Sequence, residues 1–172
     1  MTEAGLATRR ADFEALYQGY AEVVRRTAWN LGGFEDLDDI VQEVFVCIWR
    51  GWDQFEGRSD RRTWVYRITI NTAREHWRRK GRRRSLLARF FGESPQPQSI
   101  PGGQGAWEQR RHLGRALDQL SREQREAVSL VYLEGLELVE AAKACGVPLG
   151  TIKSRLFAAR GRLQQLLEDV HG

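Results

Sequence analysis

The chain has 172 residues, of which 41% are hydrophobic and 29% charged, an ordinary balance for one domain or two small ones. No apolar run approaches the roughly 20 residues that cross a bilayer, and the first residues lack the apolar core of a secretion signal. We therefore expect a cytoplasmic protein without membrane insertion. The net charge of +4 permits nucleic-acid binding but does not require it.

The two cysteines, Cys47 and Cys145, each lie within an apolar helical pattern, which predicts small buried residues rather than a disulfide. The three histidines show no metal-ligand spacing. Asp38 and Asp39 are adjacent carboxylates, but no histidine or third carboxylate converges on them. The sequence also lacks a nucleophile–base pair and a glycine-rich phosphate loop. We therefore expect no metal, no cofactor and no enzymatic activity.

Helical periodicity dominates the N-terminal half. The segment 36–57 has apolar residues every three or four positions, and three aspartates near its start suit the positive end of a helix dipole. A third helix is predicted from about Arg61 to Lys80, and no segment alternates like a β-strand. The first helix is predicted to end at Gly32 and Gly33. Its apolar stripe consists of Phe13, Leu16, Tyr17, Tyr20, Val24, Ala28 and Leu31.

The composition changes in the middle of the chain. Residues 92–105, GESPQPQSIPGGQG, hold three of the four prolines and almost no core-forming residue, which is typical of a flexible linker. Beyond it, Ser121 followed by Gln124 has the form of a capping box and predicts a helix start. A short helix around residues 138–145 and a long one from about 149 to 169 follow. This organisation predicts two all-helical domains joined by a tether.

The segment EAAKACGVPLGTIKSRL has the spacing of a helix-turn-helix. Ala142 is small enough for two helices to cross closely, and Gly146 can adopt the left-handed conformation of the turn. Val147 and Ile152 would hold the second helix against the first. Pro148 is tolerated because the first turn of a helix has no internal hydrogen bond to lose.

If the second helix of this motif enters a DNA major groove, its N-terminal residues face bases and phosphates. The alternative is a helical hairpin whose basic residues are only solvated. The combination of spacing, turn and basic face favours DNA binding. The predicted DNA-facing residues are Gly150, Thr151, Lys153, Ser154, Arg155 and Phe157.

The third predicted helix, TWVYRITINTAREHWRRKGRRR, combines aromatic residues, Asn71 and a basic end in which six of the seven residues 78–84 are Arg or Lys. Basic side chains neutralise phosphates, aromatic rings stack on exposed bases, and Asn offers a donor and an acceptor to a base edge. For Trp64 and Trp77, the alternative role is packing in the protein core. For the basic run, the alternative is a helix end that is only solvated. Because dense like charges repel one another, an anionic partner explains the basic run better.

Three motifs in this order resemble bacterial RNA polymerase sigma factors of the extracytoplasmic-function group, the two-domain members of the sigma-70 family. DLDDIVQEVFVCIWR is similar to the polymerase-binding helix of region 2, and TWVYRITINTAREHWRRKGRR to the adjoining segment that melts and reads the −10 element. YLEGLELVEAAKACGVPLGTIKSRLFAARGRL is similar to the region 4 helix-turn-helix that reads the −35 element. The resemblance implies an all-α fold with region 2 at residues 10–84, a flexible linker at 85–106 and region 4 at 107–170.

The resemblance also implies roles for individual residues. Asn71 would capture an extruded base of the −10 element, since a base taken out of the stack needs a prepared pocket. Lys153, Ser154, Arg155 and Phe157 would contact the −35 element. The −10 strand would also be followed by Arg67, Arg74, Arg78 and Arg79. The clamp helices of the largest polymerase subunit would be bound by Asp38, Asp39, Gln42, Glu43, Trp49 and Arg50.

The expected function is that of an alternative sigma factor, which binds core polymerase at its clamp helices and flap, directs it to −35/−10 promoters and promotes DNA melting. The resemblance implies an anti-sigma factor as a further partner. A flexible tether would raise the effective concentration of the second domain once the first is bound. The rival hypotheses are a helix-turn-helix regulator that does not join polymerase and an enzyme with a DNA-binding appendage.

Overall fold

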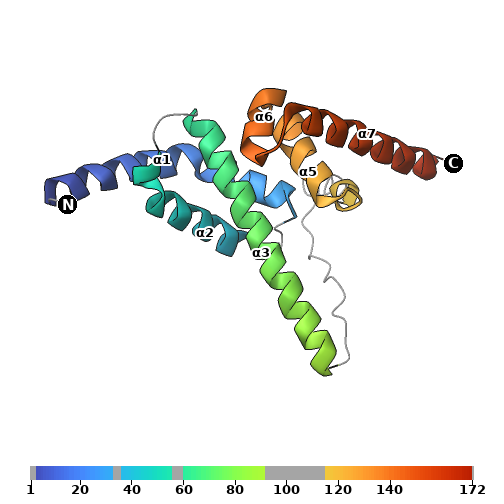
Figure 1. Ribbon diagram of the computed structural model, residues 1–172, viewed down its shortest axis with the longest axis horizontal. Helices are drawn as coiled ribbons and strands as arrows, with labels where there is room; N and C mark the ends of the chain where they lie inside the picture. The colour runs from blue at the N-terminus through green and yellow to red at the C-terminus, as the bar shows by residue number, and fades with distance from the viewer. Residues whose placement is uncertain (1–2, 33–35, 56–59, 92–114, 172) are drawn as a thin grey trace.

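The computed structural model describes residues 3–32, 36–55, 60–91 and 115–171, which contain helices and no strand. The N-terminal half holds α1 (Glu3–Asn30), α2 (Leu37–Arg50), the 3-10 turn η1 (Trp52–Gln54) and α3 (Arg61–Phe91) (Figure 1). The C-terminal half holds α5 (Arg122–Val128), the π-helical turn η2 (Ser129–Leu133), α6 (Leu138–Cys145) and α7 (Leu149–His171). The all-α prediction is confirmed. No helix in these ranges has the length and apolar character needed to cross a bilayer.

Helices α1, α2 and α3 pack together around an apolar core. The amphipathic pattern of α2 buries one face, on which Ile40, Val44 and Ile48 are fully enclosed. Trp64 and Trp77 are partly buried against this core, so core packing is part of their role. The facing positions of α1 and α3 are buried as well: Val24, Ala28, Val65, Tyr66, Ile70 and Ala73.

The helix-turn-helix prediction is confirmed in α6 and α7. Gly146 ends α6 in the left-handed conformation with φ +69°, and the amide of Val147 closes the turn on the carbonyl of Ala142 at 3.0 Å. Ile152 of α7 is fully buried beside Ala142 and its neighbours in the core. These contacts fix the angle between the two helices and leave the N-terminal turns of α7 at the surface.

The predicted capping box is also present at the start of α5. The Ser121 hydroxyl accepts a hydrogen bond from the Gln124 amide at 3.2 Å, and the Gln124 side chain accepts one from the Ser121 amide at 3.0 Å. Both amides would otherwise lack a helical partner, so the box defines where α5 begins.

Two details differ from the sequence-based expectation. α3 continues past Lys80 to Phe91, because residues 82–91 contain no glycine or proline and several good helix formers. Cys47 is exposed, so the prediction of burial was wrong for it, whereas Cys145 is buried; both are free thiols. Successive side chains of a helix point about 100° apart, so the side chain of Cys47 points away from the core in which its neighbour Ile48 is fully buried. Most of the predicted linker, residues 92–106, lies outside the described residues.

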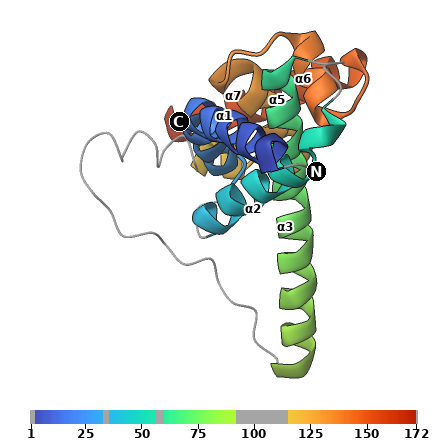
Figure 2. The same ribbon diagram turned by 90° about the vertical axis from the view of Figure 1, so that its left-hand side faces the viewer.

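The two halves of the molecule pack against each other through α3. In both views α6 lies beside the N-terminal half of α3, while the C-terminal half of α3 extends away from the other helices (Figures 1 and 2). The end of α1 also contacts η2. The C-terminal half therefore covers a part of α3 that carries predicted DNA-contacting residues.

Replacing Gly146 with Ala should lower the free energy of unfolding by about 1 kcal/mol, because a Cβ disfavours the left-handed backbone of the turn. An added Cβ would meet no atom within 4 Å at Gly146 or at Gly161 of α7, so the two sites differ in backbone conformation and not in space. Gly161→Ala is the matched control and should raise stability by about 0.5–1 kcal/mol. Urea titration followed by circular dichroism measures both, and a stabilised Gly146→Ala would contradict the account.

Candidate nucleic-acid interface

Three predicted DNA-contacting residues of α3 share one face of the helix. Arg67, Asn71 and Arg74 follow one another at spacings of four and three residues. The side chains of Arg67 and Asn71 are exposed, and that of Arg74 is partly buried. Nη1 of Arg74 donates to Oδ1 of Asn71 at 3.4 Å. The structure thus brings an amide and two guanidinium groups together on one surface.

The Arg74 side chain points toward the C-terminal half of the molecule. Its Nε and Nη2 donate to the two carboxylate oxygens of Glu126 at 2.7 and 2.5 Å, and Nη1 and Nη2 each lie 3.3 Å from the carbonyl oxygen of Cys145. The hydrogen bonds to Glu126 raise the pKa of the Arg74 guanidinium above its usual value. A bidentate pair of this kind is among the stronger charge-assisted contacts in proteins. In this arrangement the guanidinium is already occupied by a carboxylate.

The basic end of α3 has carboxylate partners within the N-terminal half. Arg78 pairs with Glu75 one turn earlier, and Nη2 of Arg79 donates to Glu43 of α2 at 2.5 Å. Substantial parts of both arginine side chains stay exposed, 65% of Arg78 and 48% of Arg79. Exposed ion pairs are weak, so these cations can exchange a carboxylate for a phosphate at little cost. The side chains of residues 83–91 lie outside the described part of the chain.

The N-terminal turns of α7 present most of the predicted −35 residues to solvent. Phe157 is 79% exposed, an unusual position for a large aromatic side chain. Gly150, Lys153 and Ser154 are exposed and Thr151 is partly buried, its carbonyl accepting a hydrogen bond from the Ser154 hydroxyl at 3.0 Å. Arg155 differs from the rest: only 19% of its side chain is exposed, and Nη1 lies 3.9 Å from Glu126.

Three of the predicted polymerase-binding residues, Asp38, Gln42 and Trp49, line a shallow groove between α1 and α2, whereas Asp39, Glu43 and Arg50 do not line it. Asp38, Asp39, Gln42 and Arg50 are exposed, and Glu43 and Trp49 are partly buried. The groove has a volume of about 460 Å³ and an apolar floor that sequence reasoning missed: Phe13, Tyr17, Val41, Phe45 and Val46. Tyr17, which the sequence places in the apolar stripe of α1, is 40% exposed in this groove.

The acidic start of α2 is occupied by ion pairs. Asp38 accepts a hydrogen bond from Arg25 at 2.6 Å. Within the described ranges, no group of three or more His, Cys, Asp or Glu side chains is arranged to hold a metal ion. The neighbouring carboxylates Asp38 and Asp39 therefore belong to a polar helix end that borders an apolar groove.

A buried carboxylate that sequence reasoning also missed joins the two halves. The Glu134 side chain is fully enclosed; it accepts hydrogen bonds from Nε and Nη2 of Arg26 at 2.8 and 2.6 Å and from the Tyr66 hydroxyl at 2.9 Å. Nη2 of Arg62 donates to the Glu134 carbonyl at 2.8 Å. Burial, and then the adjacent carboxylate, raise the pKa of Tyr66 to about 12. The sequence contains no signal for this cluster, because Arg26 and Tyr66 are 108 and 68 residues away from Glu134 along the chain.

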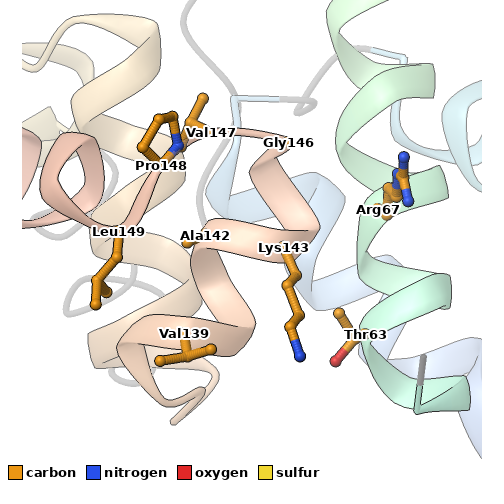
Figure 3. Close-up of a pocket in the computed structure, with 9 residues that line it drawn as sticks. All are labelled: Thr63, Arg67, Val139, Ala142, Lys143, Gly146, Val147, Pro148 and Leu149. Atoms are coloured by element: carbon orange, nitrogen blue, oxygen red, sulfur yellow. The ribbon is translucent and has the colours of Figure 1, made fainter. Parts of the chain in front are cut away.

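A second groove separates part of the two halves. It has a volume of about 720 Å³ and lies between Thr63 and Arg67 of α3 on one side and the helix-turn-helix on the other (Figure 3). Lys143 of α6 lies across from these α3 residues in the same groove (Figure 3). Its remaining lining is largely apolar and comes from the turn and its flanks: Val139, Ala142, Gly146, Val147, Pro148 and Leu149.

Comparisons with known proteins agree in both halves. Residues 16–83 match the family Sigma-70 region 2, and residues 110–163 match Sigma-70, region 4. The ECF RNA polymerase sigma-E factor of Escherichia coli strain K12 is 34% identical over 144 residues, which cover 78% of this chain and 75% of that protein. The RNA polymerase sigma-H factor of Pseudomonas aeruginosa is 32% identical over 145 residues, covering 79% and 75%.

Solved structures give the same result. The sigma factor RpoE from Bartonella quintana, in complex with the anti-sigma factor NepR, superposes with a TM-score of 0.77 and 31% identity over 91% of this chain and 97% of that one. CnrH in complex with the cytosolic domain of CnrY has a TM-score of 0.69 and 25% identity, covering 93% and 90%.

The raised pKa of Tyr66 predicts a pH dependence of stability. An ionisable group with a pKa of about 12 in the folded chain and about 10 in the unfolded chain stabilises the fold fully below pH 10, and this stabilisation is lost as the pH rises through 12. The free energy of unfolding should therefore fall between pH 10 and pH 12, and fall less steeply in Tyr66→Phe. Denaturant titrations across this range measure the difference. Parallel curves for the two proteins would contradict a buried, neutral Tyr66.

Proposed function

This chain belongs to the extracytoplasmic-function group of the sigma-70 family, and from that membership and the geometry above we propose how it works. It binds core RNA polymerase in the cytoplasm, directs it to −35/−10 promoters and holds the melted strand, while the polymerase supplies the catalysis. Residues 10–84 act as the region 2 domain and 107–170 as the region 4 domain. The observation that carries the proposal is the occurrence of both matched regions, in this order, in one chain.

The groove between α1 and α2 is proposed as the polymerase-binding surface. An apolar floor with charged and polar residues on its rim is the usual anatomy of a protein–protein interface. Asp38 and Gln42 form part of that rim, and Trp49 contributes one wall, its ring 5.1 Å from that of Phe13. Asp39, Glu43 and Arg50 lie outside the groove lining and are proposed to contact polymerase from the rest of the α2 surface. Exposed Tyr17 and Val46 fit this role, since apolar groups left in water are stabilised when a partner covers them.

The face of α3 that carries Asn71 is proposed as the −10 surface. Exposed Asn71 offers an amide to an unpaired base, and Arg67, Arg74, Arg78 and Arg79 supply the positive charge that a phosphate backbone needs. The N-terminal turns of α7 are proposed as the −35 surface, where Lys153 and Arg155 provide charge and exposed Phe157 an apolar contact. A repressor or activator that binds DNA without joining polymerase does not require a region 2 domain.

An anti-sigma factor is proposed as the partner that holds the protein inactive. The relatives RpoE and CnrH were both solved with a second protein, and the RpoE partner is an anti-sigma factor. The same apolar groove that would meet polymerase is available to such a partner. Occupation by one protein would then exclude the other.

Run-off transcription with core polymerase tests the proposed function. A library of promoter fragments is incubated with core enzyme, with and without this chain, and transcripts are mapped. Transcripts from defined start sites that depend on the chain are expected. Their absence across the library, together with sequence-specific binding of the chain alone to duplex DNA, would identify a regulator that does not join polymerase.

Asn71→Ala should reduce open-complex formation by about tenfold or more, because the capture of an unstacked base loses its hydrogen bonds. Its affinity for core polymerase should stay within about twofold, since Asn71 lies on α3 away from the α1–α2 groove. Permanganate reactivity of melted thymines reports the opening. Gln18→Ala, which removes an exposed amide from α1, is the control. Equal loss of melting and polymerase binding in Asn71→Ala would refute the base-capture role.

Lys153→Ala should weaken promoter binding by the holoenzyme and lower the slope of log K against log salt concentration by about one. Lys153 is exposed near the start of α7, where a cation can approach a phosphate. Arg10→Ala, which removes an exposed charge from α1, should leave the slope unchanged. Filter binding between low and physiological salt gives both slopes. If Lys153→Ala retained the wild-type slope, its side chain would not contact DNA phosphate.

A further inference from the structure

Arg9 of α1 lies beside the apolar groove between α1 and α2. Arg9, Phe13 and Tyr17 follow one another at spacings of four residues, so they share one face of the helix. Phe13 and Tyr17 line the groove, whereas Arg9 lies one turn before them and outside the lining. Arg9 also precedes the residues that match region 2, which begin at residue 16. Its role therefore has to be found in its contacts.

The guanidinium of Arg9 is bound at the C-terminal end of α2. Nη1 donates to Oδ2 of Asp53 at 2.9 Å, and Nη2 donates to the main-chain carbonyl of Trp49 at 2.5 Å. Cζ lies 4.6 Å from the centre of the Trp49 ring, within the range of a cation–π contact. Only 13% of the Arg9 side chain is exposed. A cation is favourable here, since the last carbonyls of a helix lack helical partners and carry partial negative charge.

These contacts orient the Trp49 side chain, which lines the groove. The Trp49 ring also lies 5.1 Å from that of Phe13, nearly perpendicular to it at 83°. Arg9 and Phe13, one helical turn apart, thus contact the same indole. An indole at a surface can otherwise adopt several rotamers, and ordering such a side chain during binding costs free energy. Because tryptophan is among the residues that contribute most to binding at interfaces, fixing its ring beforehand strengthens the interface.

The position of Arg9 is explained better by the ring contact than by its ion pair. Asp53 is 72% exposed, and exposed ion pairs contribute little. Nε of Arg9 is buried and makes no hydrogen bond, a cost that a side chain serving only Asp53 could avoid by remaining in water. Contacting the ring and donating two hydrogen bonds at once requires a guanidinium, since a lysine ammonium is a compact charge without that planar, branched shape.

We propose that Arg9 is a positioning residue for polymerase binding, which fixes the Trp49 ring as a wall of the α1–α2 groove in the free chain. Trp49 makes the contact with polymerase, and Arg9 acts through Trp49. The inference rests on the proposed function, which assigns polymerase to this groove. It adds to that function a residue outside both the groove lining and the matched region.

The first test measures the affinity of the full-length chain for immobilised core polymerase by biolayer interferometry. Arg9→Ala should bind about five- to tenfold more weakly, because Trp49 must then be ordered during binding. Arg10→Ala is the matched control: it removes the same charge from the next, exposed position and should change the affinity by about twofold or less. Arg9→Lys keeps the charge and should still bind about threefold more weakly or worse. Wild-type affinity in Arg9→Lys, or equal losses in the two alanine variants, would overturn the proposal.

A double-mutant cycle shows whether Arg9 acts through Trp49. Trp49→Ala should weaken polymerase binding by about tenfold or more. Adding Arg9→Ala to Trp49→Ala should weaken it by less than about twofold further, because no ring is left to position. If Arg9→Ala had its full effect without Trp49, or if Trp49→Ala bound like wild type, Arg9 would not act through this ring.

Fluorine NMR of the free chain labelled with 5-fluorotryptophan tests the positioning without polymerase. Trp49→Phe identifies the Trp49 signal, which should shift and broaden in Arg9→Ala. The signals of Trp64 and Trp77 on α3 should keep their positions if the variant is folded. Should Arg9→Ala not fold, Asp53→Asn removes only the acceptor of Nη1 and should shift the Trp49 signal in the same direction as Arg9→Lys. A Trp49 signal unchanged in the folded variants would contradict the positioning role.

The wild-type chain separates the two hypotheses. If it did not bind core polymerase, the proposed function would be contradicted, and the fluorine spectra would decide whether Arg9 fixes Trp49. Normal binding of wild type with no loss in Arg9→Ala would eliminate the positioning role alone.

Discussion

The pairing of Arg74 with Glu126 is the contact on which the arrangement of the molecule depends. The two side chains are 52 residues apart in sequence, come from different halves of the chain and meet at 2.5 Å with Glu126 almost fully buried. A carboxylate enclosed in this way must have a cation beside it, so the region 4 domain can lie against α3 only where an arginine is available. Glu134 repeats the requirement with Arg26. Charge satisfaction and the packing of α6 against α3 therefore together determine how the two domains sit together.

Helix α3 takes part both in the packing of the domains and in the proposed contact with nucleic acid. α3 packs one face into the bundle with α1 and α2, and presents another, with Asn71 and Arg74, for nucleic acid. The second face meets the C-terminal half in the free chain. Promoter DNA and the region 4 domain therefore use the same helix, whereas the groove proposed for polymerase lies between α1 and α2.

Much of the fold could be predicted from sequence because its determinants are local. The apolar spacing of α2, the capping box at Ser121 and the left-handed turn at Gly146 each depend on residues a few positions apart. The prediction for Cys47 was wrong because a residue at the edge of an apolar stripe can face either way. Glu126 and Glu134 could not be assigned, since their partners are remote in sequence and a carboxylate in a helix is normally solvated. For the candidate site, the motifs predicted which residues share the faces of α3 and α7, but not that Arg74 and Arg155 both meet the buried carboxylate of Glu126.

The distance between the two domains in the free chain tests the central claim most directly. Spin labels on exposed Cys47 and on Gln164→Cys in α7 report it by double electron–electron resonance; Cys145 should stay unlabelled, because burial raises the pKa of its thiol to about 11. The account predicts one narrow, short distance in the wild-type chain and a broader, longer distribution in Glu126→Gln/Glu134→Gln, which has lost the two buried charges. The same distribution in both proteins would contradict it.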